Sequence, residues 1–152
     1  GAGYGKIGST VGGTSNDGNK LKQRFLRNTP ALESLRERVI RAAGRGYLTV
    51  LDGRRLHVRS EHAALNTLLQ AAGAIVMKKA LVILDDYAKQ WKIDYKFIGN
   101  IHDEVQAEVA EEQAEKYGWL AVECLKAAGL EFGLRCPLDG EYKVGTTWAE
   151  TH

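Results

Sequence analysis

Residues 61–91 carry the longest helical pattern in the chain, and this segment constrains the fold more than any other. Its middle is apolar on nearly every side, which is typical of a helix buried in the centre of a domain. Lys78 and Lys79 interrupt the apolar run, which stays short of the roughly 20 residues that a membrane span needs. We therefore expect one long central helix in a chain of 152 residues, enough for a single core of ordinary size.

Shorter elements precede this helix. The glycine-rich start predicts a loop with one short helix around residues 6–11, and Asn19 is the expected cap of a helix that begins near Lys20. Pro30 is expected in the first turn of another helix that ends at Gly44. Alternating residues on either side of Asp52-Gly53 then predict a β-hairpin.

A second hairpin and an amphipathic helix follow the long helix. The hairpin covers residues 97–109, the helix begins near residue 110 and ends at Gly129, and the tail predicts one or two short strands. The order of elements indicates an α+β fold: helices in front, a long buried helix, and an antiparallel β-hairpin packed on helices.

The second hairpin contains the stretch FIGNIHDEVQAEV, in which His102, Asp103 and Glu104 interrupt apolar residues. Such a stretch is either a polar hairpin tip or a site. Adjacent carboxylates suit Mg²⁺, which prefers oxygen ligands and usually takes one or two carboxylates from the protein. Pairs of such ions assist nucleophilic attack at phosphorus, but that chemistry needs carboxylates from more than one segment.

Two further patterns concern partners. His62, Asn66 and Gln70 are spaced four residues apart, so they form one polar stripe on the long helix, and Gly73 continues that side. The stripe either contacts a closely approaching ligand or satisfies nearby backbone groups. Residues 1–60 carry a net charge of +8 and residues 61–152 one of −6, so the front half has either a polyanion partner or a solvated charged helix face.

Four collinear segments resemble family A DNA polymerases. NIHDEVQAEV resembles the His-Asp-Glu element called motif C, and GTTWAETH resembles the C-terminus of the family. GAGYGKIGSTVGG with LKQRFLRNTPALESLRE resembles the finger helices just after motif B. LDGRRLHVRSEHAALNTLLQAAGAIVMKKAL resembles the hairpin and long palm helix before motif C. The sequence HVRSEHAALNTLLQ most resembles that of the replicative polymerases of T-odd short-tailed phages.

The resemblance implies roles for individual residues. Asp103 and Glu104 match the metal-binding acids of a site for two Mg²⁺ ions, and His102 matches the histidine beside the primer 3′ end. Gln70 and Asn66 match residues that touch the minor groove of the primer–template, whose purine N3 and pyrimidine O2 acceptors a carboxamide can read in any correct pair. The implied phosphate contacts are Arg54, Arg55 and Arg59. His62 stands where repair-type members tend to carry arginine.

The resemblance also implies an incomplete enzyme. It places residues 1–46 in the fingers and residues 47–152 in the palm of a right-hand polymerase fold, with motifs A and B upstream. We therefore expect the C-terminal portion of a DNA-directed DNA polymerase that is inactive alone. Its expected partners are primer–template DNA, dNTP and the missing N-terminal portion; its expected location is the cytoplasm, that of the bacterial host if a phage encodes it. The alternatives are a catalytically incomplete DNA-binding module and a structural α+β domain with a polar turn.

Overall fold

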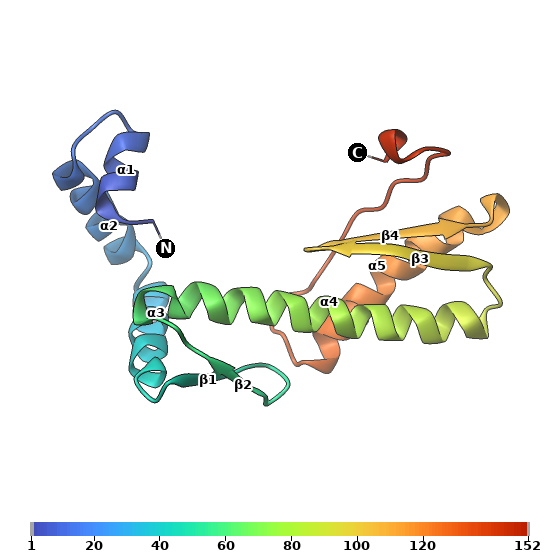
Figure 1. The fold of residues 1–152 in the computed structure, drawn as a ribbon, viewed down its shortest axis with the longest axis horizontal. Coiled ribbons are helices and arrows are strands. Elements are labelled where there is room, and N and C mark those ends of the chain that lie inside the picture. Colours follow the sequence, from blue (N-terminus) through green and yellow to red (C-terminus); the bar gives the residue numbers. More distant parts are fainter. Residues whose placement is uncertain (1, 152) are drawn as a thin grey trace. The chain divides into compact units, whose positions relative to one another are not determined.

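The computed structural model describes residues 2–151, and the chain divides into two compact units, Gly1–Gln70 and Ala71–His152. Helices and two small antiparallel sheets alternate along the chain, each sheet being a two-stranded hairpin (Figure 1). The predicted mixture of helices and antiparallel hairpins is therefore confirmed. Each unit is described by itself.

The first unit is built from three helices, a hairpin and the start of the long helix. Its elements are α1 (Tyr4–Thr10), α2 (Ser15–Asn28), α3 (Pro30–Ala43), β1 (Tyr47–Thr49), β2 (Arg55–His57), the short 3₁₀ helix η1 (Glu61–Ala63) and the beginning of α4 (Ala64–Gln90).

The start of α2 differs from the sequence prediction. Thr14, not Asn19, is the N-cap: its hydroxyl accepts from the Asp17 amide while the Asp17 carboxylate accepts from the Thr14 amide at 2.8 Å. This reciprocal pair satisfies two backbone donors that a helix start leaves open, so it extends the helix five residues further toward the N-terminus than Lys20. The helix also includes Gly18, which is buried against α1. Pro30 stands in the first turn of α3, as predicted.

The β1–β2 hairpin closes the core of the first unit. The strands pair Tyr47 with His57 and Leu48 with Leu56, and Gly53 in the connecting turn has a φ of 83°. Leu48 points inward and packs with side chains of α3 and the start of α4: Val39, Ala43 and Ala64. The predicted Asp52-Gly53 turn is confirmed.

The second unit holds the rest of α4, β3 (Tyr95–Ile101), β4 (Glu104–Val109), η2 (Glu111–Gln113), α5 (Ala114–Glu131) and η3 (Trp148–Glu150). The β3–β4 hairpin packs on α4 and α5 (Figure 1), around Leu84, Ala88, Tyr117, Leu120 and Cys124. A neighbouring cluster joins α4 to the end of α5 through Val76, Ala80 and Ala128. Among the described residues of the tail, the predicted strands are replaced by coil and η3.

The long helix α4 is buried along one face rather than all round. Buried residues recur every four positions at Val76, Ala80, Leu84 and Ala88, whereas Leu69 and Val82 are more than half exposed. Among the described helices, Glu61–Gln90 is the one whose length and apolar composition would suit a membrane span. Core helices of water-soluble proteins can have the same length and composition. With Lys78 and Lys79 at its middle, this helix gives only weak support for such a span.

Candidate functional site

Three polar residues lie at the tip of the β3–β4 hairpin. Ile101 pairs with Glu104, so His102 and Asp103 form the two-residue turn between the strands. All three polar side chains, His102, Asp103 and Glu104, are exposed. The side chain of Gln106 donates to Glu104 at 2.7 Å, which fixes one carboxylate oxygen of Glu104 on the strand. The tip therefore offers two adjacent carboxylates and an imidazole to a ligand.

The turn holds His102 in a sparsely populated backbone conformation. Its φ is 58°, in the left-handed region that favours glycine. A non-glycine residue there costs of order 1 kcal/mol, and such residues cluster at functional sites. The chain thus keeps an imidazole at a position where glycine would fit with less strain.

A β-bulge separates this tip from the base of the hairpin. The register shifts between Phe97 and Gly99, which leaves Ile98 without a partner on β4 and 64% exposed. Bulges bend a strand and change the direction of the residues beyond them, and they are common next to active sites. The bulge therefore sets the direction in which the tip projects.

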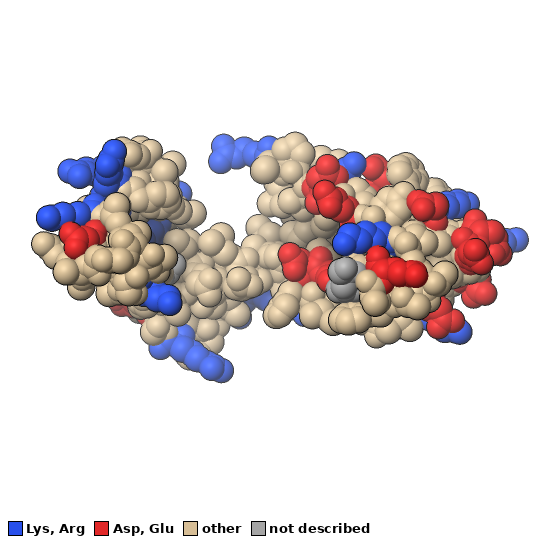
Figure 2. All heavy atoms as spheres, turned by 90° about the horizontal axis from the view of Figure 1, so that it is seen from above, with Lys and Arg blue, Asp and Glu red and all other residues tan. Residues whose placement is uncertain are grey.

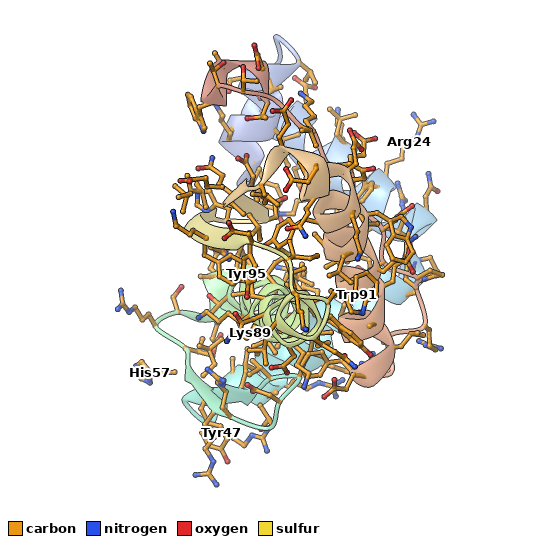
Figure 3. All side chains as sticks on the ribbon, turned by 90° about the vertical axis from the view of Figure 1, so that its right-hand side faces the viewer. Arg24, Tyr47, His57, Lys89, Trp91 and Tyr95 are labelled. Carbon is orange, nitrogen blue, oxygen red and sulfur yellow. The ribbon has the colours of Figure 1, made fainter. Side chains whose placement is uncertain are left out.

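The base of the hairpin is anchored to α4. The Tyr95 hydroxyl donates to the Asp85 carboxylate, and Lys89 pairs with the same carboxylate at 2.6 Å. Hydrogen bonds from Lys89 and Tyr95 hold the pKa of Asp85 below its usual value. Burial, helped by the hydrogen bond to Asp85, raises the pKa of Tyr95 to about 12. Figure 3 shows Lys89 and Tyr95 close together in this unit.

Two other acids in the described part of the chain already have partners of their own. Asp85 is committed to Tyr95 and Lys89, and Asp52 to Arg54. Among residues 2–151, no three His, Cys, Asp or Glu side chains gather in a way that could hold a metal ion. At the tip, the described residues therefore supply two adjacent carboxylates beside the His102 imidazole.

The polar stripe of the long helix lies in the first unit and is open to solvent. Asn66 and Gln70 are exposed on consecutive turns of α4, and His62 is exposed one turn earlier in η1. No side-chain hydrogen bond is formed by Asn66 or Gln70 within the described part of the chain, so satisfying nearby backbone groups does not explain them. A Cβ at Gly73 would meet nothing within 4 Å, which leaves room beside this helix.

The three predicted phosphate contacts have different surroundings. The guanidinium of Arg54 pairs with Asp52 at 2.5 Å, whereas that of Arg55 lies 4.7 Å from the centre of the Tyr47 ring. Arg59 is exposed just beyond β2. Lys and Arg side chains predominate over the first unit on the face shown in Figure 2 (left), and acids gather over the second. Sequence reasoning missed Arg45, which lies over the same ring and follows the end of α3.

Comparison with known proteins identifies the family. The pattern that defines DNA polymerase family A matches residues 1–150. The DNA-directed DNA polymerases of Escherichia phage T7 and Escherichia phage Phieco32 are 38% and 36% identical to the chain over its whole length. The chain spans 25% and 26% of those two proteins, about a quarter of each.

A solved structure agrees at the level of the fold. The POL domain of Pol1 from M. smegmatis, in complex with DNA primer-template and dNTP, superposes with a TM-score of 0.73 at 20% identity, over 82% of this chain and 24% of that one. The sequence-based resemblance, including its phage affinity, is confirmed. The chain belongs to DNA polymerase family A.

Proposed function

We propose that this chain is the C-terminal portion of a DNA-directed DNA polymerase that carries out template-directed nucleotidyl transfer in DNA replication. The observation that carries the proposal is the hairpin tip: in a family A chain, His102, Asp103 and Glu104 are exposed together at a strained two-residue turn. The φ of 58° at His102 supports the proposal, because residues in sparsely populated backbone conformations are enriched at functional sites. Its place of action would be the cytoplasm, that of the bacterial host if a phage encodes it.

The donor set at the tip fits Mg²⁺. Asp103 and Glu104 would hold the metal through carboxylate oxygens, and Gln106 orients the Glu104 carboxylate. When bound, two Mg²⁺ ions supply activation of an attacking oxygen and neutralisation of charge at phosphorus. His102 would lie beside the primer 3′ end, where an imidazole can hydrogen-bond to sugar or phosphate oxygens.

The remaining proposed roles concern the primer–template. Asn66 and Gln70 would donate from their exposed carboxamides to acceptors in the minor groove. Every correctly formed base pair presents such acceptors, so the contact would not depend on the DNA sequence. Arg54, Arg55 and Arg59 would contact phosphates, unequally because Arg54 is already paired with Asp52. His62 continues the exposed side of Asn66.

The proposal assigns residues 1–46 to the fingers and residues 47–152 to the palm. The missing N-terminal portion would supply the further carboxylate of the metal site and the groups that hold the incoming dNTP. This fits the length of the chain, about a quarter of its phage relatives, and the two-carboxylate tip. We therefore expect no primer extension by the chain alone.

Complementation tests the proposal. The chain is mixed with the upstream portion of the same polymerase, and primer extension is measured with Mg²⁺ and dNTPs. We expect restored synthesis that Asp103→Asn lowers about 1,000-fold, because the metal contributes several kcal/mol of transition-state stabilisation. Glu104→Gln should lose much less, and Asp139→Asn, an exposed acid near the tail, serves as the control. Equal losses from Asp103→Asn and Asp139→Asn would refute the proposed site.

The basic first unit favours a second candidate function, a DNA-binding module without catalysis. Such a module would bind primer–template, but mixing with the upstream portion would not restore synthesis. A structural domain would do neither. Measuring DNA binding and primer extension on the same samples separates the three possibilities.

A further inference from the structure

The outer face of the β1–β2 hairpin carries an unusual group of side chains. Residues on a strand alternate between faces, so Leu48 and Leu56 face the core while Tyr47, Arg55 and His57 face outward. Tyr47 and His57 are directly opposite each other in the register. Figure 3 shows both on the outside of the hairpin. We call Arg45, Tyr47, Arg55 and His57 the Tyr47 patch.

Two guanidinium groups share the Tyr47 ring. The guanidinium carbon of Arg55 lies 4.7 Å from the ring centre and that of Arg45 5.4 Å. Both distances are within the range of cation–π attraction. The Nε of Arg45 also donates to the Ala42 carbonyl at 3.3 Å, at the end of α3. The ring and the helix end thus hold two long side chains that would otherwise be free to rotate.

No acid neutralises this pair within the described residues. Neither Arg45 nor Arg55 forms an ion pair there, although both are exposed. Arg54, their neighbour on the hairpin, shows the opposite arrangement, because its guanidinium is paired with Asp52 at 2.5 Å. Arg54 is therefore neutralised, whereas Arg45 and Arg55 lie over one ring without an ion-pair partner among the described residues.

Two like charges that lie over one ring repel each other, and a bound anion offsets that repulsion. A guanidinium that lies over a ring still presents its N–H edge, and that edge matches two phosphate oxygens. Neighbouring phosphates of one DNA strand are spaced closely enough for two such groups to bind consecutive ones. Most protein–DNA hydrogen bonds go to phosphate and sugar oxygens, and arginine is a common donor to them, so the patch suits a backbone contact.

We propose that the Tyr47 patch binds consecutive phosphates of one strand of duplex DNA, with Arg45 and Arg55 as the contacts and Tyr47 as the residue that positions them. The proposal rests on the proposed function, since it presumes that this chain meets a primer–template. It adds Arg45 and Tyr47 to the proposed DNA-contacting surface.

The salt dependence of DNA binding tests the proposal. Affinity of the 152-residue chain for a 20-base-pair duplex is measured by fluorescence anisotropy between 50 and 300 mM NaCl. Each phosphate contact contributes about −0.9 to the slope of log K against log salt. Arg45→Gln/Arg55→Gln should therefore reduce the slope by about 2 and weaken binding roughly 10- to 100-fold at the lowest salt.

Matched variants separate the patch from net charge. Lys96→Gln/Glu108→Gln removes an exposed ion pair of the second unit and should leave the slope unchanged. Arg135→Gln/Lys143→Gln removes two exposed cations of the tail and should also leave it unchanged. Tyr47→Phe keeps the ring and should give the wild-type slope. Tyr47→Ala removes the ring and should reduce the slope by about half as much as Arg45→Gln/Arg55→Gln does.

Several results would overturn the proposal. Equal slope changes in the arginine pair and either control would mean that only net charge matters. If Arg45→Gln/Arg55→Gln reduced the slope for a 20-nucleotide single strand but not for the duplex, the duplex backbone would be excluded as the ligand. Failure of the wild-type chain to bind DNA would also refute it. Restored primer extension with an unchanged slope in Arg45→Gln/Arg55→Gln would refute this inference and leave the proposed function standing.

Discussion

At the scale of single residues, the Tyr95 phenol decides how the hairpin base behaves at high pH. Its pKa is raised to about 12, first by burial and then by the Asp85 carboxylate, while an unfolded tyrosine ionises near pH 10. The folded state therefore keeps a proton that the unfolded state has lost. Below pH 10 the contribution of this group to the free energy of unfolding should not change with pH, and it should fall as the pH rises from 10 to 12.

Tyr95→Phe tests this expectation. At pH 8 the variant should lose about 1 kcal/mol, because a hydrogen bond is removed while Lys89 still pairs with Asp85. Between pH 10 and 11.5 its unfolding free energy should fall less steeply than that of the wild type. Urea denaturation followed by circular dichroism measures both. Parallel pH profiles would show that the Tyr95 phenol ionises alike in the folded and unfolded states.

Sequence predicts residues well where their neighbours in the chain determine their position. His102 and Asp103 fall in the turn of an alternating hairpin, so their place follows from the pattern around them. The link between Tyr95 and Asp85 joins two elements and depends on how the hairpin packs on α4. Arg45 and Arg55 meet on one ring only because the β1–β2 register places Arg55 near Tyr47.

At the scale of elements, the α1–α2 pair depends on glycine. A Cβ on Gly18 would collide with the Tyr4 carbonyl of α1 and approach the Gly8 amide to 2.7 Å. The two helix backbones therefore touch where no side chain fits. Gly18→Ala should destabilise the pair by about 1–3 kcal/mol, the usual range for overpacking, although alanine favours a helix more than glycine does.

Gly5→Ala is the matched control for this prediction. Gly5 lies in α1, and a Cβ there would meet nothing within 4 Å. The substitution should therefore stabilise the helix by up to about 1 kcal/mol. Thermal denaturation and amide hydrogen exchange of α1 and α2 give both results. A stabilising Gly18→Ala would show that the helices do not approach as closely as described.

The same pair shows why element boundaries were harder to predict than elements. Asn19 is a good capping residue, but Thr14 with Asp17 forms a reciprocal cap, and the intervening Gly18 is kept because α1 packs on it. The packing of α1 on Gly18 therefore outweighed the capping preference of Asn19 and the low helix preference of glycine. The long helix was predicted at nearly its observed length, yet its burial on one face could not be read from an apolar composition.

At the scale of the whole molecule, the charge asymmetry predicted from the sequence coincides with the two compact units. The boundary at Gln70 lies close to residue 60, where the basic part of the sequence ends. Net charge by itself fits many polyanions. The exposed acids of the β3–β4 tip and the family match make DNA the partner that we propose.

The exposed apolar surface of the second unit leads to a prediction about assembly. Ile98, Ile101 and Trp119 are each more than half exposed, as is Leu130 at 78%. Large apolar side chains gathered on a surface usually mark an interface. We expect the chain alone to bind the dye ANS and the upstream polymerase portion to reduce that signal, with a negative heat-capacity change in calorimetry.

Substitutions at the hairpin make this expectation specific. Ile98 and Ile101 lie on β3, next to the proposed metal-binding tip, whereas Leu130 lies near the end of α5. If the upstream portion covers the hairpin, Ile98→Ser/Ile101→Ser should weaken its binding about 10-fold or more, since each buried side chain contributes about 1.5–3 kcal/mol. Leu130→Ser should leave it unchanged. If Ile98→Ser/Ile101→Ser and Leu130→Ser weakened binding equally, the contact would not be specific to the hairpin. If synthesis were restored while ANS fluorescence stayed undiminished, this surface would remain exposed in the assembled enzyme.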